Sequence, residues 1–78
     1  MSDTLQDYKQ RMEKAENLFR YSHLPPHLQE VSKPFFEMAT KLVDVLPNSP
    51  EATLCLRKLW EAKNLAVYAT VEAKENQN

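Results

Sequence analysis

The stretch from Asn48 to Thr70 constrains the fold more than any other part of the chain. Ser49 suits the N-cap of a helix, Pro50 suits its first position, and the Glu51 carboxylate suits its first turn, where the helix dipole is positive. The apolar residues that follow recur every three or four positions, so we expect a long helix with one apolar face of mostly small side chains. The residues of this face are Ala52, Cys55, Leu56, Leu59, Ala62, Ala66 and Ala69.

Larger apolar residues of the same stretch lie off this face. They are Leu54, Trp60, Leu65, Val67 and Tyr68. A helix with more apolar surface than one neighbour covers is expected to be buried on a second side. A chain of 78 residues also buries only roughly 60% of its unfolded surface, so it is marginal as a monomer. We therefore expect a homo-oligomer.

The whole chain is expected to be all-α. It contains no glycine, which argues against β-hairpins, because their tight turns depend on positive φ angles. We expect one domain over residues 1–78, with a short N-terminal helix over 3–19 and a polar, frayed tail over 72–78. The helices expected over 27–46 and 50–71 are joined by a short loop and should form an antiparallel hairpin.

The first two of these helices carry apolar residues at helical spacing. For the first, Asp3 is the expected N-cap and the apolar residues are Leu5, Tyr8, Met12, Ala15 and either Leu18 or Phe19. For the second they are Leu28, Val31, Phe35, Met38, Leu42 and either Val45 or Leu46. Pro34 interrupts the second helix, which either kinks there or ends so that Ser32 caps a new one. We favour a continuous, kinked helix, because the apolar spacing persists across the proline.

Charge and hydropathy exclude several classes of protein. The 10 Lys and Arg residues and 11 Asp and Glu residues give a net charge of −1, which argues against a general DNA or RNA binder. A few well-placed cations still suffice for a small anion. No apolar run approaches the roughly 18 residues of a membrane span, and the polar start resembles neither a secretory signal nor a transit peptide. The single cysteine fits a reducing, cytosolic setting.

Residues typical of catalysis or metal binding do not form a convincing group. Cys55 is expected to be a buried, inert thiol of the third helix. His23 and His27 have the spacing of metal ligands, but no further Cys, His or acidic cluster completes a site. We therefore expect no enzyme activity, no metal and no cofactor.

Residues with the chemistry of ligand recognition gather between the first two helices. Phe19, Arg20, Tyr21 and His23 follow one another closely, and Lys33 lies near the start of the next helix. Aromatic rings stack on purines, and Arg and Lys bind phosphate. The alternative interpretation is that Phe19 and Tyr21 only pack the first helix against the others.

A set of short motifs occurs in a characteristic order. An aromatic-x-Tyr sequence is followed by His and Pro, then by a helix start that contains Gln, and later by Pro-x-Ser before a Leu-x-x-Leu-x-x-Ala helix. The matching residues are Phe19-Arg20-Tyr21, His23, Pro25-Pro26, Gln29, Pro47-Asn48-Ser49, Leu56, Leu59, Ala62, Ala66 and Ala69. With these motifs, residues 19–71 resemble the helical hairpin of phage anti-CBASS cyclic-nucleotide sponges, which is also found in Thoeris anti-defence sponges.

This resemblance implies a function. Sponges of this family are small all-helical homo-oligomers, typically hexamers, that act in the cytoplasm of the host bacterium. They bind cyclic dinucleotides, and often cyclic trinucleotides at separate sites, without cleaving them. The resemblance implies that Tyr21 stacks on a base and that Lys33 binds a phosphate, with Phe19, Arg20 and His23 beside them. Two other functions remain open: a helical oligomeric adaptor that binds a host protein, and a nuclease that cleaves the messenger.

Overall fold

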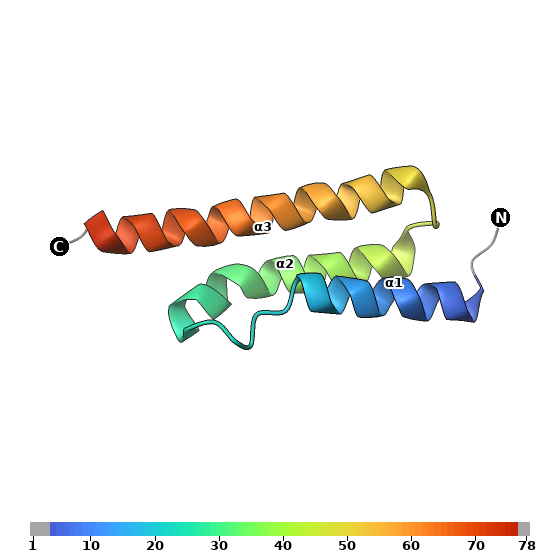
Figure 1. Ribbon diagram of the computed structural model, residues 1–78, viewed down its shortest axis with the longest axis horizontal. Helices are drawn as coiled ribbons and strands as arrows, with labels where there is room; N and C mark the ends of the chain where they lie inside the picture. The colour runs from blue at the N-terminus through green and yellow to red at the C-terminus, as the bar shows by residue number, and fades with distance from the viewer. Residues whose placement is uncertain (1–3, 77–78) are drawn as a thin grey trace.

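The protein consists of three α-helices in a computed structural model that describes residues 4–76. In chain order they are α1 (Leu5–Leu18), α2 (Pro26–Val45) and α3 (Pro50–Asn76), and the described residues include no strand (Figure 1). The expected all-α class is confirmed.

Short-range hydrogen bonds explain where α1 and α3 begin. The Ser49 hydroxyl accepts a hydrogen bond from the Ala52 backbone N–H at 3.1 Å, which confirms Ser49 as the N-cap of α3. For α1 the N-cap is Thr4, whose hydroxyl accepts from the Asp7 backbone N–H at 3.1 Å, while the Asp7 carboxylate accepts from the Thr4 N–H at 3.5 Å. The expected cap, Asp3, lies outside the described residues, and Thr4 takes that role. No side chain caps α2, which begins with Pro26 in its first turn.

The second helix continues through Pro34, so the interpretation in which Ser32 caps a new helix is wrong. Figure 1 shows the first turns of α2 inclined to the rest of the helix. The third helix continues to Asn76, past the expected end at residue 71. Helix propensity explains the extension, because Glu, Ala and Lys follow and Lys74 complements the negative end of the dipole.

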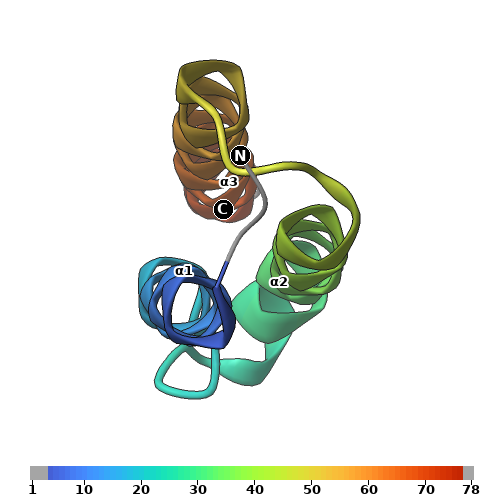
Figure 2. The same cartoon turned by 90° about the vertical axis from the view of Figure 1, so that its right-hand side faces the viewer.

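The second helix is the centre of the molecule, because it packs against both α1 and α3. Viewed along their axes, the three helices lie at the corners of a triangle (Figure 2). The principal extents are 54 × 21 × 14 Å, and the radius of gyration is 14.4 Å. A compact domain of this length has a radius of gyration of about 11 to 12 Å, so the molecule is elongated and leaves long helix faces open to solvent.

Two neighbours change which residues of α2 are buried. The buried residues are Leu28, Ser32, Ala39 and Val43. Met38, expected on the apolar face, is instead 50% exposed. Because α2 contacts helices on two sides, its buried line is displaced from the expected one onto small residues that allow close approach. Ser32 is fully buried, and its hydroxyl has no hydrogen-bond partner among the described residues.

The inward face of α3 is also rotated from the expected one. Cys55 is exposed, so the prediction of a buried thiol is wrong. Ala62 and Ala69 are exposed as well, whereas Trp60 and Val67 are half-buried. Larger side chains remove more apolar area from water than alanines do, which favours the rotated face.

The buried face of α1 also differs in part from the expected one. Of the two alternatives at its end, Phe19 is fully buried and Leu18 is 38% exposed. Leu5, which was expected on the apolar face, is 70% exposed. The core therefore begins one turn into this helix. The core of the molecule consists of the apolar residues of the described chain that are fully or nearly buried. They are Ala15, Phe19, Leu28, Ala39, Val43 and Ala52.

Candidate ligand-binding site

The connection between α1 and α2 is held by hydrogen bonds to its backbone. The Gln29 side-chain amide donates to the carbonyl oxygen of Leu24 at 2.7 Å and to that of Ser22 at 3.3 Å. Within the connection, the Leu24 N–H donates to the Tyr21 carbonyl at 3.0 Å, which closes a turn. One α2 side chain thus fixes the segment that carries most of the predicted site residues.

Tyr21 lies against α2. Its ring centroid is 5.4 Å from that of Phe36, with an interplanar angle of 72°, an edge-to-face contact. Tyr21 is half-buried, so part of the ring stays open to solvent. Lys33 lies three residues before Phe36 on α2, which places the two on one helix face. Lys33 is exposed, so the helix that Tyr21 contacts also presents a cation to solvent.

The other predicted site residues are divided between the surface and the core. Arg20 and His23 are exposed in the connection, while His27 is half-buried at the start of α2. Phe19 is fully buried, and its backbone N–H donates to the Ala15 carbonyl at 3.0 Å to close α1. For Phe19, this is the arrangement that the packing interpretation predicts. Arg20, Tyr21, His23 and Lys33 are each exposed or half-buried, and below these four residues are called the connection site.

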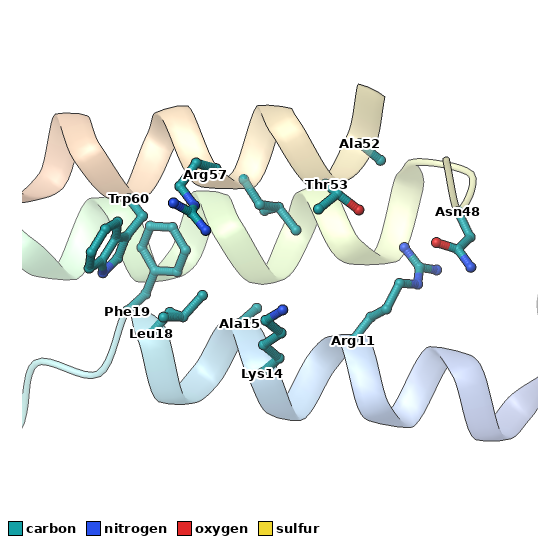
Figure 3. Close-up of a pocket in the computed structure, with 11 residues that line it drawn as sticks. Arg11, Lys14, Ala15, Leu18, Phe19, Asn48, Ala52, Thr53, Arg57 and Trp60 are labelled. Atoms are coloured by element: carbon teal, nitrogen blue, oxygen red, sulfur yellow. The ribbon is translucent and has the colours of Figure 1, made fainter. Parts of the chain in front are cut away.

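A second feature, a cleft, lies between α1 and α3. Its volume is about 320 Å³ (Figure 3). Its lining residues are Arg11, Lys14, Ala15, Leu18, Phe19, Asn48, Ala52, Thr53, Leu56, Arg57 and Trp60. Side chains from both helices point into the space between them, and α2 runs behind it. Below, this space is called the α1/α3 cleft.

The charges around the α1/α3 cleft are one-sided. Its lining contains three cations and no acid, although the chain as a whole has 10 basic and 11 acidic residues. Lys14 and Arg57 are exposed, and within the described part of the chain neither is in an ion pair. Arg11 is half-buried and already engaged in an interaction. Lys14 and Arg57 are thus the two cations that an incoming anion meets.

The two ends of the cleft differ in polarity. Leu18, Phe19 and Trp60 gather at one end, whereas Arg11 and Asn48 lie at the other (Figure 3). Trp60 is half-buried and is the one tryptophan of the sequence. An indole ring at one end, with Arg57 and Lys14 next along the cleft, fits a molecule that joins a planar ring to an anion.

Sequence reasoning missed the cleft. A local signal exists on α3, because Arg57 and Trp60 are three residues apart and share a helix face. Lys14 and Leu18 are four apart on α1 in the same way. Nothing local indicates that these two pairs face each other, since α1 and α3 are brought together by α2.

Two side chains outside these sites have shifted pKa values. A hydrogen bond from the Tyr8 hydroxyl to the Asp44 carboxylate, at 3.1 Å between oxygens, raises the pKa of Tyr8 above 10.0. Partial burial lowers the pKa of the Lys63 amine on α3. Neither group lines the α1/α3 cleft or belongs to the connection site.

Residues 4–76 contain neither a metal-binding cluster nor a membrane-spanning helix. No three or more His, Cys, Asp or Glu side chains in this part are grouped so that they can hold a metal ion. None of its helices combines the length and apolar character needed to cross a membrane.

Comparisons with known proteins found no match for this chain among family models, curated proteins or solved structures.

Proposed function

We propose that this protein is a phage anti-defence protein that binds and sequesters a cyclic oligonucleotide second messenger without cleaving it. The ligand is a cyclic dinucleotide such as cGAMP, or a cyclic trinucleotide, and its removal blocks CBASS immunity in the cytoplasm of the host bacterium. The proposal draws its ligand from the family resemblance of residues 19–71. The observation that supports it is the edge-to-face contact of the half-buried Tyr21 with Phe36 on α2, the helix that also carries the exposed Lys33.

Symmetry supports the proposal. A cyclic dinucleotide has approximate two-fold symmetry, with two bases and two phosphates. A two-fold interface between copies of the chain presents each residue twice. One tyrosine and one lysine per chain then supply two stacking rings and two cations, so antiparallel helical hairpins assembled as a homo-oligomer, such as a hexamer, form a complete pocket.

Thermal unfolding in the presence of cyclic di-purine nucleotides tests the proposal. A ligand at a hundred times its dissociation constant should raise the free energy of unfolding by about 2.7 kcal/mol per site. Chromatography of the ligand released by heat then separates sequestration from hydrolysis. Recovery of the intact ring supports a sponge, and linear product supports a nuclease. If no cyclic di- or trinucleotide shifts the transition, the proposal is wrong.

Variants at the connection site test the assigned residues. Tyr21→Ala should remove a stacking ring and weaken binding by about 1 to 3 kcal/mol per base, whereas Tyr21→Phe should keep the ring and most of the affinity. Leu5→Ala is the control, since Leu5 is 70% exposed on α1 and belongs neither to the connection site nor to the exposed apolar face of α3. For the phosphate contact, Lys33→Gln is compared with Lys41→Gln, which changes an exposed lysine on the same helix. Equal affinities within either pair contradict the assignment of that residue.

One observation favours a second function, a helical oligomeric adaptor that binds a host protein. The apolar side chains of Leu54, Leu65 and Tyr68 on α3 are 56%, 69% and 62% exposed. Exposed apolar residues of this size on one helix are typical of protein interfaces. A protein that oligomerises through α3 but shows no thermal shift with any cyclic nucleotide supports the adaptor.

A further inference from the structure

We propose that the α1/α3 cleft is a second binding site, formed within a single chain, for a small molecule that joins an anionic group to a planar apolar ring. This site is separate from the connection site and does not depend on the proposed sequestration of a cyclic nucleotide. It is argued from the size, the charge and the internal polarity of the cleft.

The size of the cleft suits a small molecule. Its volume of about 320 Å³ is at the lower end of the range of about 300 to 1,000 Å³ that is usual for small-molecule pockets. The cleft is formed by α1 and α3, which both pack on α2, and alanines at positions 15 and 52 fill little of the space between them. A void over small buried residues is thus built into the arrangement of the three helices.

The charge of the cleft indicates an anion. Lys14 reaches into the cleft from α1 and Arg57 from α3, so an anion between them is met from two walls (Figure 3). The carboxylate nearest to Trp60 in the sequence, Glu61, pairs instead with Lys58, at 3.9 Å from Nζ to Oε2. Because the lining contains no acid, Lys14 and Arg57 are not neutralised within the cleft. The Arg57 guanidinium is suited to bind a phosphate or carboxylate in a bidentate manner.

The apolar end indicates what else the ligand contains. Trp60 is half-buried beside Leu18 and the buried Phe19, and a half-buried indole ring that lines a cleft is suited to stacking on a planar group. A bare inorganic anion leaves this end unfilled, and an uncharged ring leaves the two cations unsatisfied. The combination therefore favours a ligand with both parts, and it disfavours the apolar face of a second copy, which would bury Lys14 and Arg57 without partners.

Nuclear magnetic resonance provides a local test, because Trp60 gives the one indole N–H resonance of the chain. The probes are adenosine 5′-monophosphate, which has both parts of the ligand, and adenosine and inorganic phosphate, which have one part each. We expect the monophosphate to shift the Trp60 resonance in a saturable, salt-sensitive manner, and each single-part probe to bind about tenfold more weakly or less.

Matched variants test the two cations. The double variant Lys14→Gln, Arg57→Gln should weaken monophosphate binding about tenfold or more. The control Lys9→Gln, Lys74→Gln removes two exposed lysines from the same helices outside the cleft and should bind like the wild type. Circular dichroism verifies that both proteins are folded. Tyr21→Ala should leave this binding unchanged, which separates the site from the connection site.

Several outcomes overturn the proposal. They are a Trp60 resonance that does not respond to the monophosphate up to millimolar concentration, equal affinity for adenosine, and equal affinity of the two double variants.

Discussion

The helices α2 and α3 are both long and both begin with proline, yet they are buried to very different extents. Over 20 residues, α2 has four buried positions, Leu28, Ser32, Ala39 and Val43. Over 27 residues, α3 has one buried apolar residue, Ala52, and three large apolar side chains that are more than half exposed. The difference follows from position, because α2 has a neighbour on two sides, whereas α3 packs mainly on α2.

This comparison shows that apolar periodicity predicts where a helix forms but not whether that helix lies at the centre of the fold or at its edge. A centrally placed helix uses its apolar residues to hold the fold together. A peripheral helix with as many apolar residues has surface left for a ligand or another chain. Each of the following variants tests whether the two helices really divide these tasks.

The largest effect is expected from a charge in the buried line of α2. Val43 is 1% exposed, so Val43→Asp places an unpaired carboxylate in the core and should lower the free energy of unfolding by about 3 to 5 kcal/mol. Val45, on the same helix, is 59% exposed, so Val45→Asp should change the stability by about 0.5 kcal/mol or less. Urea unfolding followed by circular dichroism measures both. Similar losses for the two variants contradict the assigned buried face.

A charge on the open face of α3 should affect association instead of folding. Leu65 is 69% exposed, and burying a leucine side chain contributes about 1.5 to 3 kcal/mol, so if the proposed oligomer uses this face, Leu65→Glu should weaken self-association roughly tenfold to a hundredfold. Leu5→Glu is the control, since Leu5 on α1 is 70% exposed. Sedimentation equilibrium gives the association constants. If Leu65→Glu associates like the wild type, this face of α3 is not an interface.

The start of α3 depends on a cap that α2 lacks. Ser49→Ala removes the acceptor for the Ala52 N–H and should lower the free energy of unfolding by about 1 kcal/mol. The control is Ser22→Ala in the connection, where the Ser22 backbone carbonyl, not the hydroxyl, accepts the bond from Gln29. Thermal and urea unfolding compare the two variants. If Ser49→Ala leaves the free energy of unfolding unchanged, packing on α2 alone sets the start of α3.

The smallest effect is expected from the hydrogen bond that ties α1 to α2. Because the folded pKa of Tyr8 lies above the unfolded value of 10.0, its stabilisation is fully present below pH 10.0 and is lost as the pH rises through the folded pKa. Tyr8→Phe should therefore be slightly less stable than the wild type at neutral pH and approach it in stability at alkaline pH. Unfolding of Tyr8→Phe and the control Tyr68→Phe across this range checks the sign. A pH-independent difference excludes the Asp44 bond as its cause.

Much of the secondary structure could be predicted from local chemistry. Three helices follow from local features of the sequence. These features are the Ser49 cap, the proline in the first turn of α2 and a composition without glycine. The limits of the helices were less accurate: α3 runs to Asn76 and α1 is capped by Thr4. Such ends differ little in free energy, because one more helical turn of Glu, Ala and Lys is only weakly favourable.

The candidate sites were accessible to sequence reasoning to different degrees. Tyr21 and Lys33 are close in the chain, so sequence reasoning could propose them together, and the Tyr21–Phe36 contact lies within one connection and the helix after it. In the α1/α3 cleft, Lys14 and Arg57 come from helices that α2 separates in the chain. Helical periodicity therefore does not predict that Lys14 and Arg57 lie in the same cleft.

The sequence by itself determined that this chain forms three helices, that Ser49 caps the third, and that each helix has apolar surface to bury. Only the tertiary structure decided which face turns inward: Phe19 instead of Leu18, Ala39 instead of Met38, and Trp60 instead of Cys55. The physical reason is that the interactions act over different distances along the chain. Backbone hydrogen bonds and caps act within about one turn, whereas burial and the α1/α3 cleft depend on how whole helices are placed around α2.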